Sequence, residues 1–313
     1  MSVAFIFPGQ GSQAPGMGRE LADAYPAARA VFAEVDDALG QALSRLMWEG
    51  PADELTLTEN AQPALMAVSL AALRALEAKG FEIARRVAYV AGHSLGEYSA
   101  LAAAGSLSVA DTARLLKIRG KAMQGAVPVG QGAMAALLGA ELPQAQELAA
   151  AASDGEVCAA ANDNAPGQVV ISGTRAAIER AVALAPKFGA RRAVLLPVSA
   201  PFHCALMQPA AEAMAEALRS VEIKAPAVPV VANVLASAIT DPGEIRKRLV
   251  EQVTGMVRWR ESMLYLKEKG VDAVYEVGAG RVLTGLAKRF DGFEARSIGT
   301  PQELEAAAAA LAA

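Results

Sequence analysis

Apolar residues recur along the chain in two alternating patterns. Short continuous apolar runs, at Val3–Phe7 and Val87–Ala91, end at proline or glycine and predict buried strands. Longer segments, at Gln62–Lys79 and Leu95–Ala104, carry apolar residues at helical spacing and predict helices. Strands that alternate with helices of this length pair in parallel through crossover helices. The pattern therefore predicts an α/β core built on a parallel sheet.

The same two patterns predict the elements before and after the middle of the chain. We expect helices at Met17–Leu39, Gln41–Met47, Ala205–Ser220, Glu244–Val253 and Ser262–Gly270, and strands at Val228–Val234 and Ala273–Val277. The alanine-rich tail that follows is interpreted as compositional bias with no chemistry attached to it.

The middle of the chain has a different texture, with short strands and helices in the order β-α-β-β-α-β. The expected elements are Ala133–Leu138, Pro143–Ala152, Val157–Ala161, Gln168–Ser172, Arg175–Lys187 and Arg192–Val198. This order is the ferredoxin-like pattern. We therefore predict a ferredoxin-like small domain, residues 127–198, inserted into a large α/β domain formed by residues 1–126 and 199–313.

One strand-to-helix turn has the form G-x-S-x-G, at Gly92-His93-Ser94-Leu95-Gly96. Glycines at the two ends let the strand and helix backbones come close around a strained turn, which presents the serine hydroxyl at the helix start. There the helix dipole and the free amide of Leu95 favour negative charge on a tetrahedral intermediate. The pattern favours Ser94 as a nucleophile; the alternative is a serine that only caps the helix.

A serine nucleophile needs a base, and the chain contains only two histidines. His93 precedes the serine in the turn, so we expect its side chain to point away from the site of attack. His203 follows the predicted small domain on a proline-bent loop and is the predicted base; alone, it would read as a structural histidine. No acid between Ser94 and His203 follows a convincing core strand, so a Ser–His dyad oriented by a backbone carbonyl is expected.

Composition narrows the function further. The formal net charge is −4 with 20% charged residues, which argues against a nucleic-acid-binding surface. The two cysteines, Cys158 and Cys204, form no disulfide framework and no metal-like spacing, so we expect no metal site. The first residues lack the basic region of a signal peptide and no uncharged segment reads as a membrane span, so a cytoplasmic protein is expected.

Six segments spread along the whole chain belong together: FPGQGSQ at 7–13, GHSLGEYSAL at 92–101, KIRGKAM at 117–123, NAPGQVVISG at 164–173, Phe202-His203, and YEVGAGRVL at 275–283. In this order they resemble the malonyl-CoA:acyl carrier protein transacylase family of fatty-acid synthesis. The resemblance implies an α/β-hydrolase-like large domain with an inserted ferredoxin-like domain, as the pattern also predicts.

The resemblance implies a role for individual residues. Ser94 would attack the malonyl thioester, His203 would accept its proton, and the backbone amides of Gln10 and Leu95 would hold the oxyanion. Arg119 matches the arginine that clamps the free carboxylate of malonate, a task suited to a planar guanidinium. Without the resemblance, Arg119 reads as a solvated helix charge. The main-chain carbonyl that orients the histidine falls at Gln252.

Three further positions match residues of the acyl pocket in this family. Met123 and Val282 would line it, and Phe202 is the bulky residue that goes with malonyl rather than methylmalonyl groups in related polyketide domains. Cys204 has no assigned role. Without the resemblance, Met123 and Val282 read as plain core residues.

The reaction that the resemblance implies is a ping-pong transfer from malonyl-CoA to the phosphopantetheine thiol of acyl carrier protein, with no permanently bound cofactor. The acidic carrier would dock on basic residues at the cleft mouth, for which the candidates are Lys117, Lys121, Lys187, Arg191 and Arg192. A monomer is expected. The alternatives are a serine thioesterase or hydrolase, a carrier-binding scaffold without activity, and an acyltransferase that serves a polyketide pathway in trans.

Overall fold

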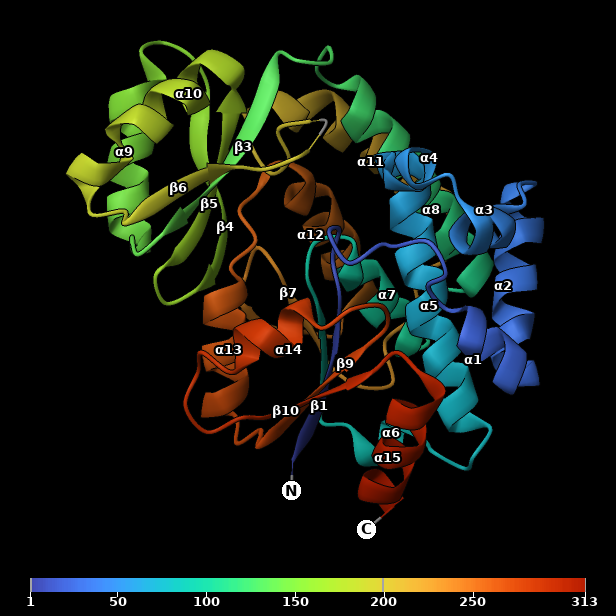
Figure 1. Ribbon diagram of the computed structural model, residues 1–313. Helices are drawn as coiled ribbons and strands as arrows, with labels where there is room; N and C mark the ends of the chain where they lie inside the picture. Colours follow the sequence, from blue (N-terminus) through green and yellow to red (C-terminus); the bar gives the residue numbers. More distant parts are fainter. Residues whose placement is uncertain (1, 199, 313) are drawn as a thin grey trace.

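Two separate sheets organise the chain in the computed structural model, which describes residues 2–198 and 200–312 (Figure 1). The first sheet has the strand order β10-β9-β1-β2-β7-β8 and the second has the order β4-β5-β3-β6. The first is formed by β1 (Val3–Phe7), β2 (Tyr89–Gly92), β7 (Val230–Ala232), β8 (Ser237–Ile239), β9 (Ala273–Val277) and β10 (Glu294–Ile298). The second is formed by β3 (Gly132–Leu138), β4 (Cys158–Ala165), β5 (Gln168–Thr174) and β6 (Arg192–Leu195).

The first sheet is parallel apart from β8, which pairs antiparallel with β7 at one edge. The central strand β1 is apolar throughout because helices cover both of its faces. Phe5 and Phe7 belong to the larger apolar core, whereas Ala4 and Ile6 belong to a second core on the other face, around Trp259. This explains why the predicted strand Val3–Phe7 is a continuous apolar run rather than an alternating one.

The helices that surround the first sheet come from both ends of the chain. They are α1 (Arg19–Ala24), α2 (Pro26–Leu39), α3 (Leu43–Glu49), α4 (Ala52–Thr56), α5 (Thr58–Glu77), α6 (Ile83–Arg86), α7 (Gly96–Ala103), α8 (Val109–Gly125), α11 (Gln208–Arg219), α12 (Pro242–Thr254), α13 (Trp259–Glu268), α14 (Val282–Ala287) and α15 (Pro301–Ala312), with a 3-10 turn η2 (Ala205–Met207). None of the described helices combines the length and the apolarity needed to cross a membrane.

The second sheet is antiparallel and carries its own helices on its outer face, at the upper left of Figure 1. These are α9 (Leu142–Ser153) and α10 (Arg175–Leu184), the latter followed by the 3-10 turn η1 (Ala185–Phe188). They close a separate apolar core with β3 and β5. The elements therefore follow the predicted order β-α-β-β-α-β. The strands of the first sheet come before and after them in the sequence.

Several predicted elements differ from the structure. The helix expected at Met17–Leu39 is two helices, because Pro26 begins a new one after the extended residue Tyr25. The alanine-rich tail forms helix α15, whose Leu304 and Leu311 are buried. Strands β8 and β10 and helix α14 were not predicted. Residue 199, where the large domain was expected to resume, lies outside the described residues, as do residues 1 and 313.

Candidate active site

The predicted strand–turn–helix is present, with Ser94 between the end of β2 and the start of α7. Its backbone has φ +53°, a left-handed conformation that a non-glycine residue rarely adopts. A Cβ atom added at Gly92 would lie 1.9 Å from the carbonyl carbon of Gly96, and one added at Gly96 would lie 2.2 Å from the carbonyl oxygen of Phe7. Both glycines therefore permit the close approach that holds Ser94 in its strained turn.

His203 reaches this serine from a different part of the chain. Its Nε2 lies 2.8 Å from Ser94 Oγ, and its Nδ1 lies 2.8 Å from the carbonyl oxygen of Gln252 and 3.1 Å from that of Gly255. Carbonyl oxygens only accept hydrogen bonds, so Nδ1 carries the proton and Nε2 is left to accept from the hydroxyl. His203 also has positive φ, +59°. The expected backbone partner at Gln252 is confirmed, and Gly255 is a second one.

Burial keeps this imidazole uncharged. Desolvation, with a smaller contribution from the nearby Arg119 cation, lowers the pKa of His203 from 6.5 to about 3. The hydrogen bonds to the two carbonyls oppose this shift but do not cancel it. A neutral imidazole beside a hydroxyl is the arrangement in which histidine acts as a general base.

Arg119 is buried beside the serine rather than solvated on its helix, with an exposed fraction of 1%. Its Nη2 donates to Ser94 Oγ at 3.1 Å and to Gln252 Oε1 at 2.9 Å, and its Nη1 donates to Gln62 Oε1 at 2.8 Å. The guanidinium also lies over the ring of Tyr98, 5.7 Å from its centroid. Desolvation lowers the pKa of Arg119 from its ordinary value. A buried guanidinium next to a hydroxyl suits an acyl group that carries its own negative charge.

Gln10 and Leu95 both line the cavity in front of Ser94. Leu95 precedes the first residue of α7, and neither its amide nor that of Gln10 donates to another described residue. The loop that carries Gln10 lies against the turn of the serine, because a Cβ atom at Gly9 would be 2.8 Å from the carbonyl oxygen of His93. Two free amides near one hydroxyl form the kind of donor pair that stabilises an oxyanion.

The cavity has a volume of about 420 Å³ and lies between strands of the second sheet, which contribute Met134 and Asn162, and the loops and helices next to the first sheet. Met123 and Phe202 contribute to its wall, as predicted. Val282 does not, and that prediction was wrong: Val282 begins α14 with 51% of its surface exposed. The reason is local, since the buried carboxylate of Glu276 accepts from the amides of Leu283 and Thr284 and so turns the first residue of the helix outward.

His93 lines the cavity as well, but its described hydrogen bond goes to the second sheet and not to the Ser94 hydroxyl. Its Nε2 lies 2.8 Å from Oδ1 of Asn164 on β4. The neighbouring Asp163 points the other way, where its Oδ2 accepts from Arg260 Nε at 2.8 Å. Asn162, on the same strand, lines the cavity. Strand β4 therefore presents Asn162 to the cavity and Asp163 to helix α13.

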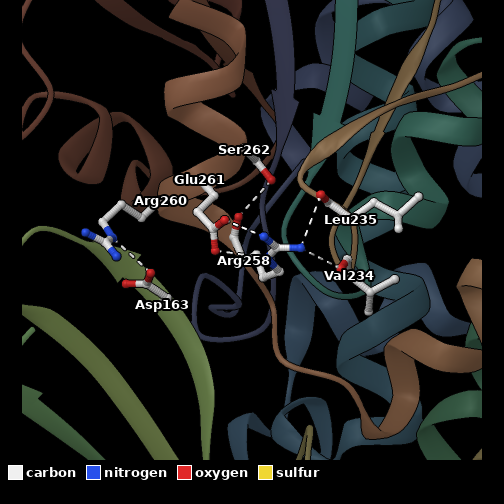
Figure 2. A network of polar contacts seen from close by, with 7 residues as sticks. All are labelled: Asp163, Val234, Leu235, Arg258, Arg260, Glu261 and Ser262. Atoms are coloured by element: carbon white, nitrogen blue, oxygen red, sulfur yellow. Dashed lines mark hydrogen bonds and ion pairs between the residues drawn. The ribbon is translucent and has the colours of Figure 1, made fainter. Parts of the chain in front are cut away.

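Figure 2 shows the polar contacts by which α13 and the residue before it connect β4 to the loop that follows β7; this connection is called the joint below. Arg258, just before the helix, pairs with Glu261 and donates to the carbonyls of Val234 and Leu235, while Arg260 reaches Asp163 on β4. The backbone of Val257 adds two bonds to β4, donating to Ala161 and accepting from Asp163. The joint positions Asn162 and Asn164 against the site.

The candidate docking cations divide into two groups. Lys117 is bound within the molecule, since its Nζ donates to Gln41 and Asn60 and lies 3.3 Å from Glu59. It is only 18% exposed, so the prediction of Lys117 as a docking residue is not supported. Lys121, Lys187, Arg191 and Arg192 are exposed.

Four polar residues of the site were not predicted: Gln62, Glu97, Asn233 and Asn162. Gln62 gives no clear signal, because its helix also carries Glu59, Asn60 and Arg74. Glu97 does give one that could have been used, because it is the only charged residue of α7. Such a residue is buried and needs a partner. Asn233 and Asn162 carry no comparable signal. The two cysteines are unpaired, and Cys204 donates only to the carbonyl of Pro201.

Comparisons with known proteins identify a family and several relatives of this chain. A family model described as an acyl transferase domain matches residues 4–300. The malonyl CoA-acyl carrier protein transacylase of Escherichia coli K12 is 47% identical over 305 residues, which cover 97% of this chain and 98% of that protein. The crystal structure of the acyl-carrier-protein-S-malonyltransferase of Bartonella henselae is 55% identical, covers both chains fully and superposes with a TM-score of 0.98. A malonyl-transacylase in complex with a type II PKS acyl-carrier protein is 42% identical, with 99% and 100% of the chains covered and a TM-score of 0.96.

Proposed function

The chain belongs to the acyl transferase family that includes the malonyl CoA-acyl carrier protein transacylases, and we propose that it uses Ser94 and His203 to transfer malonyl groups. The donor is malonyl-CoA, and the acceptor is the phosphopantetheine thiol of acyl carrier protein in fatty-acid synthesis. The observation that carries the assignment of donor is Arg119. The free carboxylate of a malonyl group is one methylene away from the carbonyl that Ser94 attacks, and Arg119 Nη2 lies 3.1 Å from Ser94 Oγ.

The reaction has two half-reactions that share one base. Ser94 Oγ attacks the thioester carbon while its proton passes to Nε2 of His203. The tetrahedral oxyanion is held by the amides of Gln10 and Leu95. It collapses with cleavage of the carbon–sulfur bond, and the proton returns from His203 to the CoA sulfur. In the second half-reaction the phosphopantetheine thiol gives its proton to His203, attacks the malonyl ester, and Ser94 leaves as the alcohol.

Arg119 also weighs against the simpler hydrolase. A thioesterase for plain acyl chains gains nothing from a fully desolvated cation, whose burial costs free energy unless an anion or hydrogen bonds compensate it. In the proposed role the guanidinium binds the malonyl carboxylate, and Met123 and Phe202 form part of the cavity wall that the acyl group meets.

A second acceptor is worth testing because of one comparison. The related malonyl-transacylase that shares 42% identity was solved with a type II PKS acyl-carrier protein. The chemistry at Ser94 is the same in both pathways and only the docking surface differs. The remaining exposed candidates for docking are Lys121, Lys187, Arg191 and Arg192.

We extend the proposal to the domain organisation. The order β4-β5-β3-β6 with α9 and α10 on one face supports a ferredoxin-like domain at residues 127–198. The parallel sheet and the turn at Ser94 support an α/β-hydrolase-like domain at residues 1–126 and 199–313. The enzyme would act as a cytoplasmic monomer without a permanently bound cofactor, and neither nucleic acid nor a membrane takes part.

The test is a mass measurement of the intact protein after incubation with malonyl-CoA in the absence of an acceptor. The proposal expects one malonyl adduct that persists for minutes in the parent and is missing in Ser94→Ala. Adding holo acyl carrier protein from a fatty-acid or a polyketide system should discharge the adduct and identify the acceptor. CoA release without an adduct would instead indicate a hydrolase, and neither adduct nor release would indicate a scaffold.

A further inference from the structure

The buried acid Glu97 lies behind the site and takes no part in the mechanism above. It is the second residue of α7, three positions after the serine, and only 2% of its surface is exposed. We propose that Glu97 is a positioning residue that holds Gln252, and through it Arg119, in the orientation that selects a carboxylate-bearing acyl group. This inference rests on the proposed malonyl transfer.

The argument begins with the side-chain amide of Gln252. Its Nε2 donates to Oε2 of Glu97 at 2.8 Å and to the carbonyl oxygen of Ser94 at 3.0 Å. Both of these partners accept and neither donates, provided that the Glu97 carboxylate is ionised. The amide therefore has to present its Oε1 on the opposite side, where it accepts from Arg119 Nη2 at 2.9 Å.

A reversed amide would place its NH₂ group against the guanidinium, and two donors cannot bond to each other. Arg119 would then lose one of the contacts that hold it in place. Its remaining hydrogen-bond partners among the described residues are Gln62 and Ser94 itself, and all three partners are neutral. Glu97 is thus the negative charge that reaches the clamp, one residue removed.

Glu97 contacts the serine turn by a second route. Its Oε2 also accepts from the backbone amide of Asn233 at 3.0 Å. The side chain of Asn233 then accepts from the amide of Ser94 at 2.8 Å and donates to the carbonyl of Gly92 at 2.7 Å. One carboxylate oxygen therefore connects the backbone of the nucleophile to the residue that orients the guanidinium.

Burial and the surrounding polar groups have opposite effects on the charge of Glu97. Burial raises the pKa of Glu97 to about 7, while the bonds from Asn233 and Gln252 and the charge of Arg119 favour ionisation. A buried carboxyl group costs free energy unless hydrogen bonds or a charge compensate it. Here the loss of charge would remove the charge-assisted bond that fixes the Gln252 amide.

A matched control exists at another strand-to-helix turn of the first sheet. Glu276, on β9, is as deeply buried as Glu97 and also accepts from backbone amides, those of Leu283 and Thr284. It touches neither Gln252 nor Arg119 in the described structure. Glu276→Gln therefore tests what the loss of a buried charge does to the protein in general.

The experiment measures the acylation half-reaction of the intact enzyme, as kcat/KM for CoA release from malonyl-CoA and from acetyl-CoA. The variants are Glu97→Gln, Glu276→Gln, Gln252→Met and the double variant Glu97→Gln/Gln252→Met. We expect Glu97→Gln to lower the malonyl-to-acetyl ratio about tenfold, which corresponds to about 1.4 kcal/mol. Glu276→Gln should leave the ratio unchanged. In the Gln252→Met background the ratio is already low, so Glu97→Gln should change it less than about twofold.

Three outcomes would overturn the inference. The first is an unchanged malonyl-to-acetyl ratio in Glu97→Gln, and the second is an equal fall of this ratio in Glu276→Gln. The third is a full tenfold effect of Glu97→Gln in the Gln252→Met background. Should Glu97→Gln fail to fold, Glu97→Asp keeps the charge but retracts it by one methylene, and the ratio should still fall about fivefold. Failure of the proposed function itself is distinguishable, because then the parent would show no malonyl adduct and no preference for malonyl-CoA.

Discussion

Two strand-to-helix turns of the parallel sheet are built alike but have different roles. After β2, the turn leads into α7, and no side chain caps the helix start; the amide of Leu95 donates to no described residue. After β9, the turn leads into α14, and the carboxylate of Glu276 accepts from Leu283 at 3.1 Å and Thr284 at 2.6 Å. Each turn is accompanied by a buried glutamate, Glu97 in the first and Glu276 in the second.

The difference lies in where each carboxylate points. Glu276 completes its own helix start, which therefore has no amide left for an anion from solution. Glu97 faces away from the start of α7 toward Gln252 and Asn233, so the helix start stays open to an oxyanion. In the proposed mechanism, an open helix start with a strained serine marks the reactive turn, and a capped start marks the structural one.

The strongest way to break the comparison is to remove the glycine that brings α7 close to β1. Gly96→Ala would place a methyl group 2.2 Å from the carbonyl oxygen of Phe7, so the turn has to move. We expect a loss of about 3 kcal/mol in the free energy of unfolding. The rate of Ser94 acylation should fall about 100-fold, because a displacement of about 1 Å is enough for that.

Gly285→Ala in α14 is the matched control, since a Cβ atom there meets nothing within 4 Å. It should raise the free energy of unfolding by about 0.5 kcal/mol, as expected for glycine replaced in a helix, and leave acylation unchanged. Thermal unfolding and the mass of the malonyl adduct measure both quantities. Full activity in Gly96→Ala would contradict the role given to the close approach.

The second prediction concerns how the rate of Ser94 acylation depends on pH through the imidazole of His203, for which the turn after β9 has no counterpart in the described structure. With a pKa of 6.5, a histidine base would lose about tenfold in acylation rate between pH 7.5 and pH 5.5. Because burial lowers the pKa of His203 to about 3, it stays neutral over this range and the rate should stay level. Acetyl-CoA is the suitable donor, since its acyl group does not engage Arg119. A tenfold fall centred near pH 6.5 that persists in Glu97→Gln, where the carboxyl group with a pKa of about 7 is absent, would show that the imidazole is solvated.

The same shift has a consequence for stability. The unfolded chain binds a proton at His203 below pH 6.5, whereas the folded chain does not bind it until about pH 3. The free energy of unfolding should therefore decrease as the pH falls through this window. A variant His203→Ala should lack this part of the decrease, which denaturant titrations at pH 7 and pH 5 can measure.

Local patterns predicted most of the fold because most elements bury a continuous apolar face. The strand at Ala273–Val277 was predicted with its observed bounds, and the middle segment in its observed order. The misses share a physical cause. Strand β10 has mostly exposed or half-exposed residues, such as Glu294 and Arg296, so its sequence shows no apolar run. Helix α15 is so rich in alanine that its buried positions do not stand out.

The site was predictable where a residue is bound to a local motif, and less so where the fold assembles it. The serine turn is legible in sequence, and the shortage of histidines pointed to His203. The burial of Arg119 came from the resemblance alone, since its helix also carries exposed cations such as Lys121. Asn233 and Glu97 meet across 136 positions of sequence, and no periodicity encodes such a contact.

The smallest expected effects concern Val282, which was predicted to line the acyl pocket but does not line the cavity. Val282 opens the capped turn with half of its surface in solvent, whereas Met123 is buried in the cavity wall, where its sulfur lies 3.7 Å from Gln62 Nε2. Val282→Ala should change kcat/KM for malonyl-CoA by less than about twofold, as usual for a surface substitution. Met123→Ala should lower this kcat/KM about fivefold. The reason is that Gln62, which accepts a hydrogen bond from Arg119, would lose its contact with Met123 and be held less well. If Val282→Ala were the more damaging of the two, the turn after β9 would belong to the acyl site, and the distinction between an open and a capped helix start would not separate reactive from structural turns.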